Sequence, residues 1–396
     1  MKYIVLLFLF VVQTTMSQNV NKLTWQEKIG DFTFLIETLK YNYPYFDTYE
    51  HKYGESWLSK SDFFLNRILA SQNNKEYLVL IDSIVGSLRH KHLDLAPTYH
   101  WNLFRARYGE ACFINPIYIQ WVNTLDKSQN EISFWNNLLP KSKINNLKTK
   151  KDIAYKDSLI PELKTAILRI PSFDLDNLKE DSLKISKFLY LASNYKYIII
   201  DIQENKGGSS FYWREGIVNR LINHPLHFKR CFILKNGKHN NSFFSHERTI
   251  NWNLELLPSL PLSFQTDTFK VIEEATTFYP SFPIPFKGKI LILTDSTVFS
   301  AADEFAYFAQ NTSWATIVGE TTGGGGIGTD PVLVRLPFSG ILIRYPALAG
   351  LNADGSLHSG TIPEIEIKGK NSDERLCKLI SMIKLLKYPS QSKWLK

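Results

Sequence analysis

Apolar residues in the first part of the chain recur at intervals of three and four, which is the spacing of one face of an α-helix. Two stretches show this spacing: Phe32, Leu35, Ile36 and Leu39, and later Leu78, Ile81, Val85 and Leu88. Tyr43-Pro44 ends the first stretch, because the residue before a proline disfavours helical backbone. We therefore expect a helical N-terminal region over residues 18–98.

Residues 99–160 show no single periodicity. The order of apolar and polar residues at 113–122 predicts a pair of strands, and residues 141–151 form a polar, basic linker. The stretch is therefore interpreted as a poorly defined linking region.

From residue 161 onwards the pattern changes to strands that alternate with helices. Apolar runs predict strands at residues 166–170, 197–202, 289–293, 315–318, 332–334 and 341–343. Amphipathic helices are predicted at residues 185–192 and 301–310. A strand, a helix and a second strand in this order form a βαβ unit with parallel strands. We expect an α/β core over residues 161–396, with a long insertion at about residues 224–287.

The extreme N-terminus has the composition of a cleavable export signal. Lys2 supplies a positive charge, residues 3–12 are apolar, and Ser17 ends a short stretch of small and polar residues. The apolar run is too short to span a bilayer, and no later segment approaches that length. The pattern predicts a signal peptide over residues 1–17 and a mature chain that begins near Gln18. It indicates a secreted or periplasmic protein without an integral membrane segment after signal cleavage.

Composition and charge exclude some classes of protein. Hydrophobic residues make up 44% of the 396 residues and charged residues 21%, which is typical of a globular chain and not of a disordered one. The formal net charge is +8, but Lys and Arg are scattered and form no stripe. A solvated basic surface is therefore favoured over a nucleic-acid partner.

Candidate chemistry lies at the ends of two predicted strands, because active sites of α/β proteins gather at the carboxyl ends of strands. The strand at residues 197–202 leads to the pair Gly207-Gly208. Paired glycines let the backbone turn with its N–H groups exposed, which an oxyanion hole requires. A plain turn would have the same composition.

The second strand end leads to Ser300, at the predicted start of a helix. A serine at this place can direct its hydroxyl into a cleft, with the Ala301 N–H at the positive end of the helix dipole. The alternative is that Ser300 only caps the helix.

Taken together, these segments resemble the C-terminal-processing (tail-specific) and tricorn-core serine peptidases. The shared motifs are Asp-x-x-x-Asn-x-Gly-Gly at 201–208, Phe-Ser-Ala-Ala-x-Glu at 299–304, Gly-Glu-Thr-Thr-Gly at 319–323 and a closing Gly-x-x-Pro-Glu strand at 360–367. The Ser-Ala-Ala form is most similar to the subgroup that includes the interphotoreceptor retinoid-binding protein modules. The Asn-Tyr-Pro-Tyr-Phe run within residues 31–57 also resembles the helical prelude of bacterial members.

The resemblance implies a crotonase-like or ClpP-like α/β peptidase core. It also implies an endopeptidase or tail-trimming activity on peptide or protein substrates, without metal or cofactor. Carried over by position, Ser300 matches the nucleophile, and Gly207 or Gly208, with Ala301, matches the oxyanion hole.

The general base is where the chain departs from the family pattern. Members of the dyad type place a lysine in the glycine loop after the serine, but this chain has no lysine between Ser300 and Lys368. The other branch uses a histidine from the N-terminal half, and residues 88–93 resemble that segment, with His92 at the position of the base and His90 beside it. The orienting glutamate has no clear counterpart. Residues 99–160 are too few, and too poor in glycine, to support the PDZ-like module that usually follows.

The leading hypothesis is an exported serine peptidase in which His92 takes the proton of Ser300, with activity that rises with pH near the histidine reference pKa of about 6.5. The alternative is a catalytically inactive peptide- or ligand-binding protein on the same fold, since fold does not determine function. A relative of the acyl-CoA-processing crotonases would share the core, but the signal peptide and the Gly-Gly and Ser segments argue against it.

Overall fold

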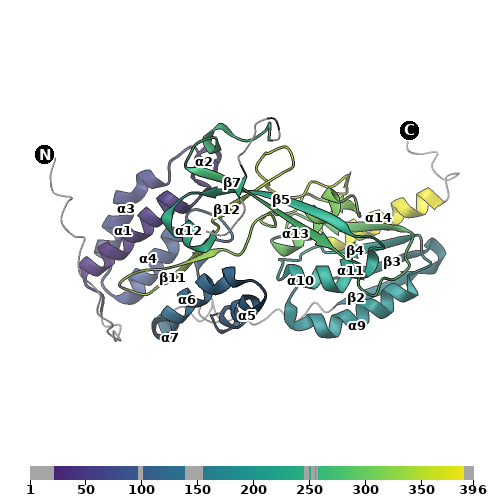
Figure 1. The fold of residues 1–396 in the computed structure, drawn as a ribbon, viewed down its shortest axis with the longest axis horizontal. Coiled ribbons are helices and arrows are strands. Elements are labelled where there is room, and N and C mark those ends of the chain that lie inside the picture. Colours follow the sequence, from purple (N-terminus) through teal and green to yellow (C-terminus); the bar gives the residue numbers. More distant parts are fainter. Residues whose placement is uncertain are drawn as a thin grey trace.

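The computed structural model describes residues 22–96, 101–138, 155–244, 249–250, 255 and 257–387. The predicted signal peptide lies outside these ranges. Helices from the N-terminal part of the chain gather at one end of the molecule, and a sheet with its covering helices forms the other end (Figure 1). A long ribbon of two strands, β5 (Leu226–Lys235) and β7 (Phe269–Phe278), runs between the two ends.

The N-terminal region is helical, as predicted. Its elements are α1 (Trp25–Asn42), α2 (Phe46–Tyr53), η1 (Leu58–Lys60), α3 (Ser61–Ala70), α4 (Asn74–Gly86) and the short strand β1 (Asp94–Leu95). Helix α1 begins at a capping box formed by Thr24 and Glu27, and Tyr43 is its C-cap, directly before the proline that was expected to end it. Within the described ranges, no helix is long and apolar enough to cross a membrane.

The prediction of strands at residues 113–122 is wrong. Residues 101–138 form α5 (Trp101–Ile114), η3 (Pro116–Tyr118), α6 (Ile119–Lys127) and α7 (Gln129–Leu138). Trp121 explains the difference, because it is 1% exposed and its indole donates to the carbonyl oxygen of Pro331 at 2.9 Å. Apolar residues that face a distant segment in this way stabilise helices whose own sequence carries little periodicity.

The α/β core is built on a six-stranded sheet in the order β13-β9-β8-β4-β3-β2. Its strands are β2 (Lys156–Ile160), β3 (Thr165–Arg169), β4 (Tyr197–Asp201), β8 (Lys289–Thr294), β9 (Thr316–Gly319) and β13 (Ile365–Glu366). All neighbours are parallel except β2 with β3, so the predicted βαβ unit is confirmed.

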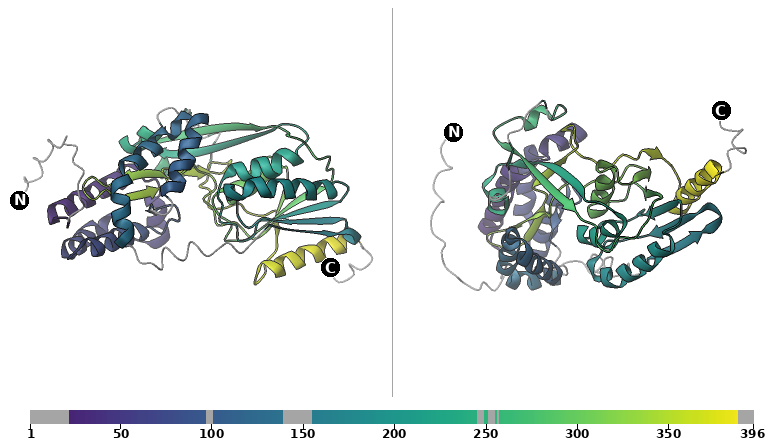
Figure 2. Two further views of the ribbon diagram at one scale, coloured as in Figure 1. Left: turned by 90° about the horizontal axis from the view of Figure 1, so that it is seen from below. Right: turned by 45° about the vertical axis from the view of Figure 1, so that its right-hand side comes forward.

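Helices cover both faces of this sheet (Figure 2). One face packs on α9 (Leu175–Leu191) and α13 (Ala301–Asn311), and the other on the C-terminal helix α14 (Ser372–Lys387). Successive side chains of β4 point to opposite faces of the sheet. Ile198 and Ile200 pack in the hydrophobic cluster on the side of α9 and α13, and Ile199 packs in the cluster on the side of α14. Burial on both faces explains why the strands appear in the sequence as continuous apolar runs.

Two smaller antiparallel sheets join the core to the N-terminal region. In one, β12 (Leu348–Leu351) pairs with β5, β5 with β7, and β7 with β6 (Thr249–Ile250). In the other, β1 pairs with β11 (Leu342–Tyr345), which pairs with β10 (Val332–Arg335). Asp31 of α1 is fully buried and accepts hydrogen bonds from the N–H groups of Phe338 and Ser339 at 2.8 and 2.9 Å. The N-terminal helices are therefore tied to the turn between β10 and β11.

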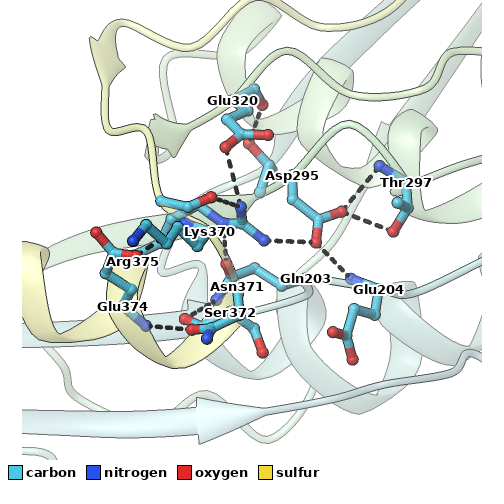
Figure 3. Close-up of polar contacts among 12 residues, drawn as sticks. Gln203, Glu204, Asp295, Thr297, Glu320, Lys370, Asn371, Ser372, Glu374 and Arg375 are labelled. Carbon is cyan, nitrogen blue, oxygen red and sulfur yellow. Dashed lines mark hydrogen bonds and ion pairs between the residues drawn. The ribbon is translucent and has the colours of Figure 1, made fainter.

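A buried polar network holds the carboxyl ends of the parallel strands in place (Figure 3). Arg375 of α14 is 7% exposed and donates to Asp295 Oδ2, after β8, at 3.0 Å and to Glu320 Oε1, after β9, at 2.9 Å. Its Nε also donates to Gln203 Oε1, after β4. One guanidinium from the last helix thus connects the segments that follow three strands of the sheet.

We predict that Arg375→Met lowers the free energy of unfolding by about 3–5 kcal/mol, because it leaves the buried Asp295 carboxylate without its partner. Urea unfolding followed by far-UV circular dichroism measures the effect. The matched control is Lys378→Met on the same helix, whose partner Glu374 lies at the surface, and the expected change is below about 0.5 kcal/mol. Equal urea concentrations at the unfolding midpoint for Arg375→Met and Lys378→Met would contradict the prediction.

Candidate active site

The two segments singled out in the sequence leave the same edge of the sheet side by side. Strands β4 and β8 are parallel neighbours, with Asp201 opposite Leu293. Beyond this point the segments stay in contact, because the N–H of Phe299 donates to the carbonyl oxygen of Asn205 at 3.0 Å. The two segments therefore lie side by side beyond the sheet.

Ser300 has a backbone conformation that is unusual for a residue with a side chain. Its φ is +59° and its ψ is −131°, and such positions cost roughly 1–3 kcal/mol and persist only where the surroundings impose them. Here the Ser300 N–H donates to the carbonyl oxygen of Gly324 at 3.0 Å, and the Ser300 carbonyl accepts from the N–H of Glu304 at 2.9 Å. Backbone contacts on both sides therefore hold the turn.

The Ser300 hydroxyl does not cap helix α13. Ser300 occupies the N-cap position, but its side chain makes no capping hydrogen bond. It lines a cavity of about 470 Å³ together with Ala301, Gly208 and His92. The capping interpretation is therefore wrong, and the hydroxyl borders a space that can hold a ligand.

The two glycines of the oxyanion segment have different surroundings. Both have positive φ angles, +94° at Gly207 and +140° at Gly208. The N–H of Gly207 already donates to Asn205 Oδ1 at 2.8 Å, and a Cβ atom there would lie 2.9 Å from Ser300 Cβ. Within the described ranges, the N–H groups of Gly208 and Ala301 have no acceptor. Of the two glycines, Gly207 permits the close approach to Ser300, and Gly208 offers the free donor.

The glycine loop at residues 323–326 packs along the Ser300 turn. The N–H of Gly323 donates to the carbonyl oxygen of Val298 at 2.6 Å. A Cβ atom on Gly325 would lie 2.4 Å from the Phe299 ring. That ring stacks beneath the ammonium group of Lys91, with Nζ 4.5 Å from the ring centre. The loop therefore has room for backbone only, which fits the run of glycines in the sequence.

His92 enters the cavity from the N-terminal region. It lies two residues before β1, which is held to β11 by hydrogen bonds from Arg344 to both carboxylate oxygens of Asp94, each at 2.8 Å. The His92 ring lies 4.6 Å from the Phe299 ring, centre to centre. The backbone N–H of His92 donates to His90 Nδ1 at 3.2 Å. Residues 91–92 form a turn, so the two histidines do not lie on one face of a strand.

Of the two candidate histidines, only His92 borders the cavity. His90 instead packs on Tyr45, with ring centres 4.8 Å apart. Burial lowers the pKa of His92 to about 3, and His90 and the positive charges of Arg344 and Lys91 act in the same direction. Among the described residues, no side chain accepts a hydrogen bond from the His92 ring. The imidazole is therefore neutral at physiological pH.

A second histidine, which the sequence did not point to, pairs with a buried carboxylate behind the site. His358 Nε2 lies 2.8 Å from Asp303 Oδ2, and both side chains are almost fully buried. Asp303 also accepts from the N–H of Gly326 at 2.8 Å and from the hydroxyl of Thr322. Burial acts to raise the pKa of Asp303, but the hydrogen bonds from His358, Thr322 and Gly326 outweigh it and lower the pKa below its usual value.

The Asp303–His358 pair braces the glycine loop. Asp303 lies one turn after Ser300 on α13, and its partners lie on the loop and on the segment before β13. His358 lies in the segment that precedes β13. It contacts Asp303 and Asn352 and does not line the cavity, whereas His92 does.

The wall of the cavity away from His92 is strongly polar. Arg230 of β5 pairs with Glu304 of α13 and with Glu274 of β7. The Ser210 hydroxyl donates to the other oxygen of Glu304. Within the described ranges, no group of His, Cys, Asp and Glu side chains comes together in a way that could hold a metal ion.

Sequence reasoning missed Asp303, His358 and Arg375. Asp303 carried a usable signal, because it lies three residues after Ser300 on a predicted helix. Arg375 carried none, since a lone arginine in an amphipathic C-terminal helix has the pattern of a solvated face.

Comparison with known proteins agrees with this geometry. The model of peptidase family S41 matches residues 164–367, just over half of the chain. Among solved structures, mature CPAF complexed with lactacystin is similar over 92% of this chain and 98% of its own, at 13% identity and a TM-score of 0.56. A putative peptidase from Parabacteroides merdae is similar over 90% of this chain and 96% of its own, at 16% identity and a TM-score of 0.51.

These likenesses confirm the expected α/β peptidase core with a helical region before it. The matched residues contain both strand ends, the Ser300 turn, the glycine loop and the closing strand. The chain therefore belongs to peptidase family S41.

Proposed function

We propose that the chain is a serine peptidase with Ser300 as its nucleophile. The observation that carries this proposal is the Ser300 turn. A strained backbone places a hydroxyl, which caps nothing, in a cavity beside the unpartnered N–H groups of Gly208 and Ala301. This combination suits acyl transfer, in which an attacking oxygen and two donors for the developing oxyanion must lie together.

In the proposed reaction, Ser300 Oγ attacks the scissile carbonyl carbon of a peptide substrate. The carbonyl oxygen gains negative charge in the tetrahedral intermediate and accepts hydrogen bonds from Gly208 and Ala301. The Ala301 N–H adds the positive end of the α13 dipole. As this intermediate collapses, the C–N bond breaks and the proton taken from Ser300 passes to the leaving amine. Water then hydrolyses the acyl-enzyme, which releases the acid and restores the Ser300 hydroxyl.

His92 is the proposed general base. It borders the cavity that contains Ser300, and its low pKa keeps the ring in the proton-accepting form at neutral pH. No carboxylate among the described residues contacts the ring, so the imidazolium formed during the reaction lacks the partner that an aspartate provides in a Ser-His-Asp triad. We therefore expect slow turnover compared with enzymes that have the full triad.

Labelling by a fluorophosphonate tests the nucleophile and the base. Wild-type protein should be labelled, Ser300→Ala should not, and His92→Ala should react at least tenfold more slowly, since proton removal typically contributes roughly 10²–10⁴-fold. His224→Ala, a change at an exposed histidine outside the cavity, is the control and should react at the wild-type rate. Absence of labelling in the wild type would contradict the peptidase proposal, and full labelling in His92→Ala would contradict the role of His92.

The pH dependence should differ from that of an ordinary histidine base. Because the pKa of His92 is held near 3, kcat/KM should be flat between pH 5 and pH 8, instead of rising through the reference value of about 6.5. The unfolded chain binds a proton at His92 below about pH 6.5 and the folded chain does not, so stability decreases as the pH falls below this value. The folded fraction is therefore measured at each pH. A tenfold fall in activity between pH 7.5 and pH 5.5 in folded protein would contradict this prediction.

We further propose that the protein is exported through a signal peptide at residues 1–17. The support is the order of Lys2, an apolar run and Ser17. The intact mass of protein recovered from the periplasm or culture medium should correspond to a chain that begins near Gln18. Recovery of the chain only in the cytosol with Met1 retained would contradict export.

A further inference from the structure

Arg214 is a charged residue of the cavity wall that the proposed mechanism does not use. It lies directly after the short helix α10 (Ser210–Trp213), which follows the oxyanion glycines, and it begins the π-helical turn η5 (Arg214–Val218). The cavity that contains Ser300 is lined by Arg214 and, one turn earlier, by Ser210.

The other cavity arginines already have carboxylate partners. Arg107 pairs with Asp174 at 2.8 Å, and Arg230 pairs with Glu304 and Glu274. Arg214 has no ion pair or hydrogen bond from its side chain to any described residue, and its Nε is buried without an acceptor. A guanidinium is always charged and carries five donors, and Arg214 is only partly buried, so its remaining N–H groups can donate to an acceptor that a ligand supplies.

The aromatic surface under Arg214 fixes its position. The guanidinium carbon lies 4.8 Å from the centre of the Phe278 ring. That ring is in turn stacked on Trp213 at 5.6 Å and packs on Phe308 at 4.5 Å. A guanidinium that lies over an aromatic ring can still donate two parallel hydrogen bonds to a carboxylate.

The neighbouring carboxylate does not replace such a ligand. One oxygen of Glu304 accepts a hydrogen bond from Arg230, and the other accepts one from the Ser210 hydroxyl. Its charge acts on Arg214 at longer range, but no hydrogen bond or ion pair joins the two side chains within the described ranges. Among the arginines that line the cavity, Arg214 is therefore the one whose guanidinium has no acceptor within the described ranges.

We infer that Arg214 binds a carboxylate of the substrate next to the Ser300 turn, so that the site favours peptides with an acidic group. This inference rests on the proposed function, because it names the substrate class of the same site. The carboxylate belongs either to an Asp or Glu side chain or to the C-terminus of the peptide, and both sources present the same acceptor to the guanidinium.

Peptide binding to the Ser300→Ala variant tests this inference without requiring catalysis. The probes are fluorescein-labelled, alanine-rich hexapeptides. The central residue is Glu or Gln and the C-terminus is a free acid or an amide, which gives four peptides in all. Fluorescence anisotropy gives the Kd of each. A side-chain carboxylate predicts that Glu peptides bind roughly 10–100-fold more tightly than Gln peptides, and a terminal carboxylate predicts the same ratio for free acids over amides.

The matched variants are Arg214→Gln and Arg220→Gln, both in the Ser300→Ala background. Arg220 lies on the same helical segment, donates to Ser182 and does not line the cavity. Arg214→Gln should remove the preference, and Arg220→Gln should keep it. Four equal affinities, binding of none of the peptides, or a preference that persists in Arg214→Gln would each overturn the inference. Fluorophosphonate labelling of the wild type decides the proposed function separately, so failure of one does not imply failure of the other.

Discussion

The ion pair between Arg375 and Asp295 lies beneath both loops that form the site, and the geometry of the site depends on it. Asp295 also accepts hydrogen bonds from the N–H groups of Glu204 and Thr297, so one carboxylate ties the oxyanion segment to the segment that leads to the serine. Both charges are buried, and a buried charge that loses its partner is strongly destabilising. Docking of helix α14 therefore stabilises the carboxyl ends of the strands, from which the two segments of the site lead away.

The Ser300 backbone is strained, and the glycine loop stabilises this conformation through a hydrogen bond. Ser300 keeps a positive φ because the carbonyl oxygen of Gly324 accepts its N–H, while Asp303 fixes the same loop through Gly326. The Asp303–His358 pair thus acts on the nucleophile through backbone contacts. His92 borders the same cavity, no carboxylate among the described residues contacts its ring, and burial, reinforced by positive neighbours, holds its pKa low. The electrostatics of the site favour a neutral histidine beside a rigid serine turn.

Much of the fold could be predicted because the relevant signals are local. Strands buried on both faces appear as apolar runs, and amphipathic helices appear as three- and four-residue spacing, so the βαβ unit and α1 were predicted correctly. The helices at residues 101–138 were not, because their stability comes from contacts such as that between Trp121 and Pro331, which are distant in sequence. The long β5–β7 ribbon was taken for part of an insertion for the same reason, since its partner β12 follows much later in the chain.

By itself, the sequence determined the family resemblance, the βαβ order, the position of Ser300 at a strand-to-helix turn and the glycines that face it. These features depend on residue types at short spacing, where backbone conformation is decided locally. Only the tertiary structure decided which glycine N–H is free, which histidine borders the cavity, how far the pKa of His92 is lowered and which arginine has no partner. Each of these properties depends on burial and on the charges that distant segments bring together, and neither is contained in local spacing.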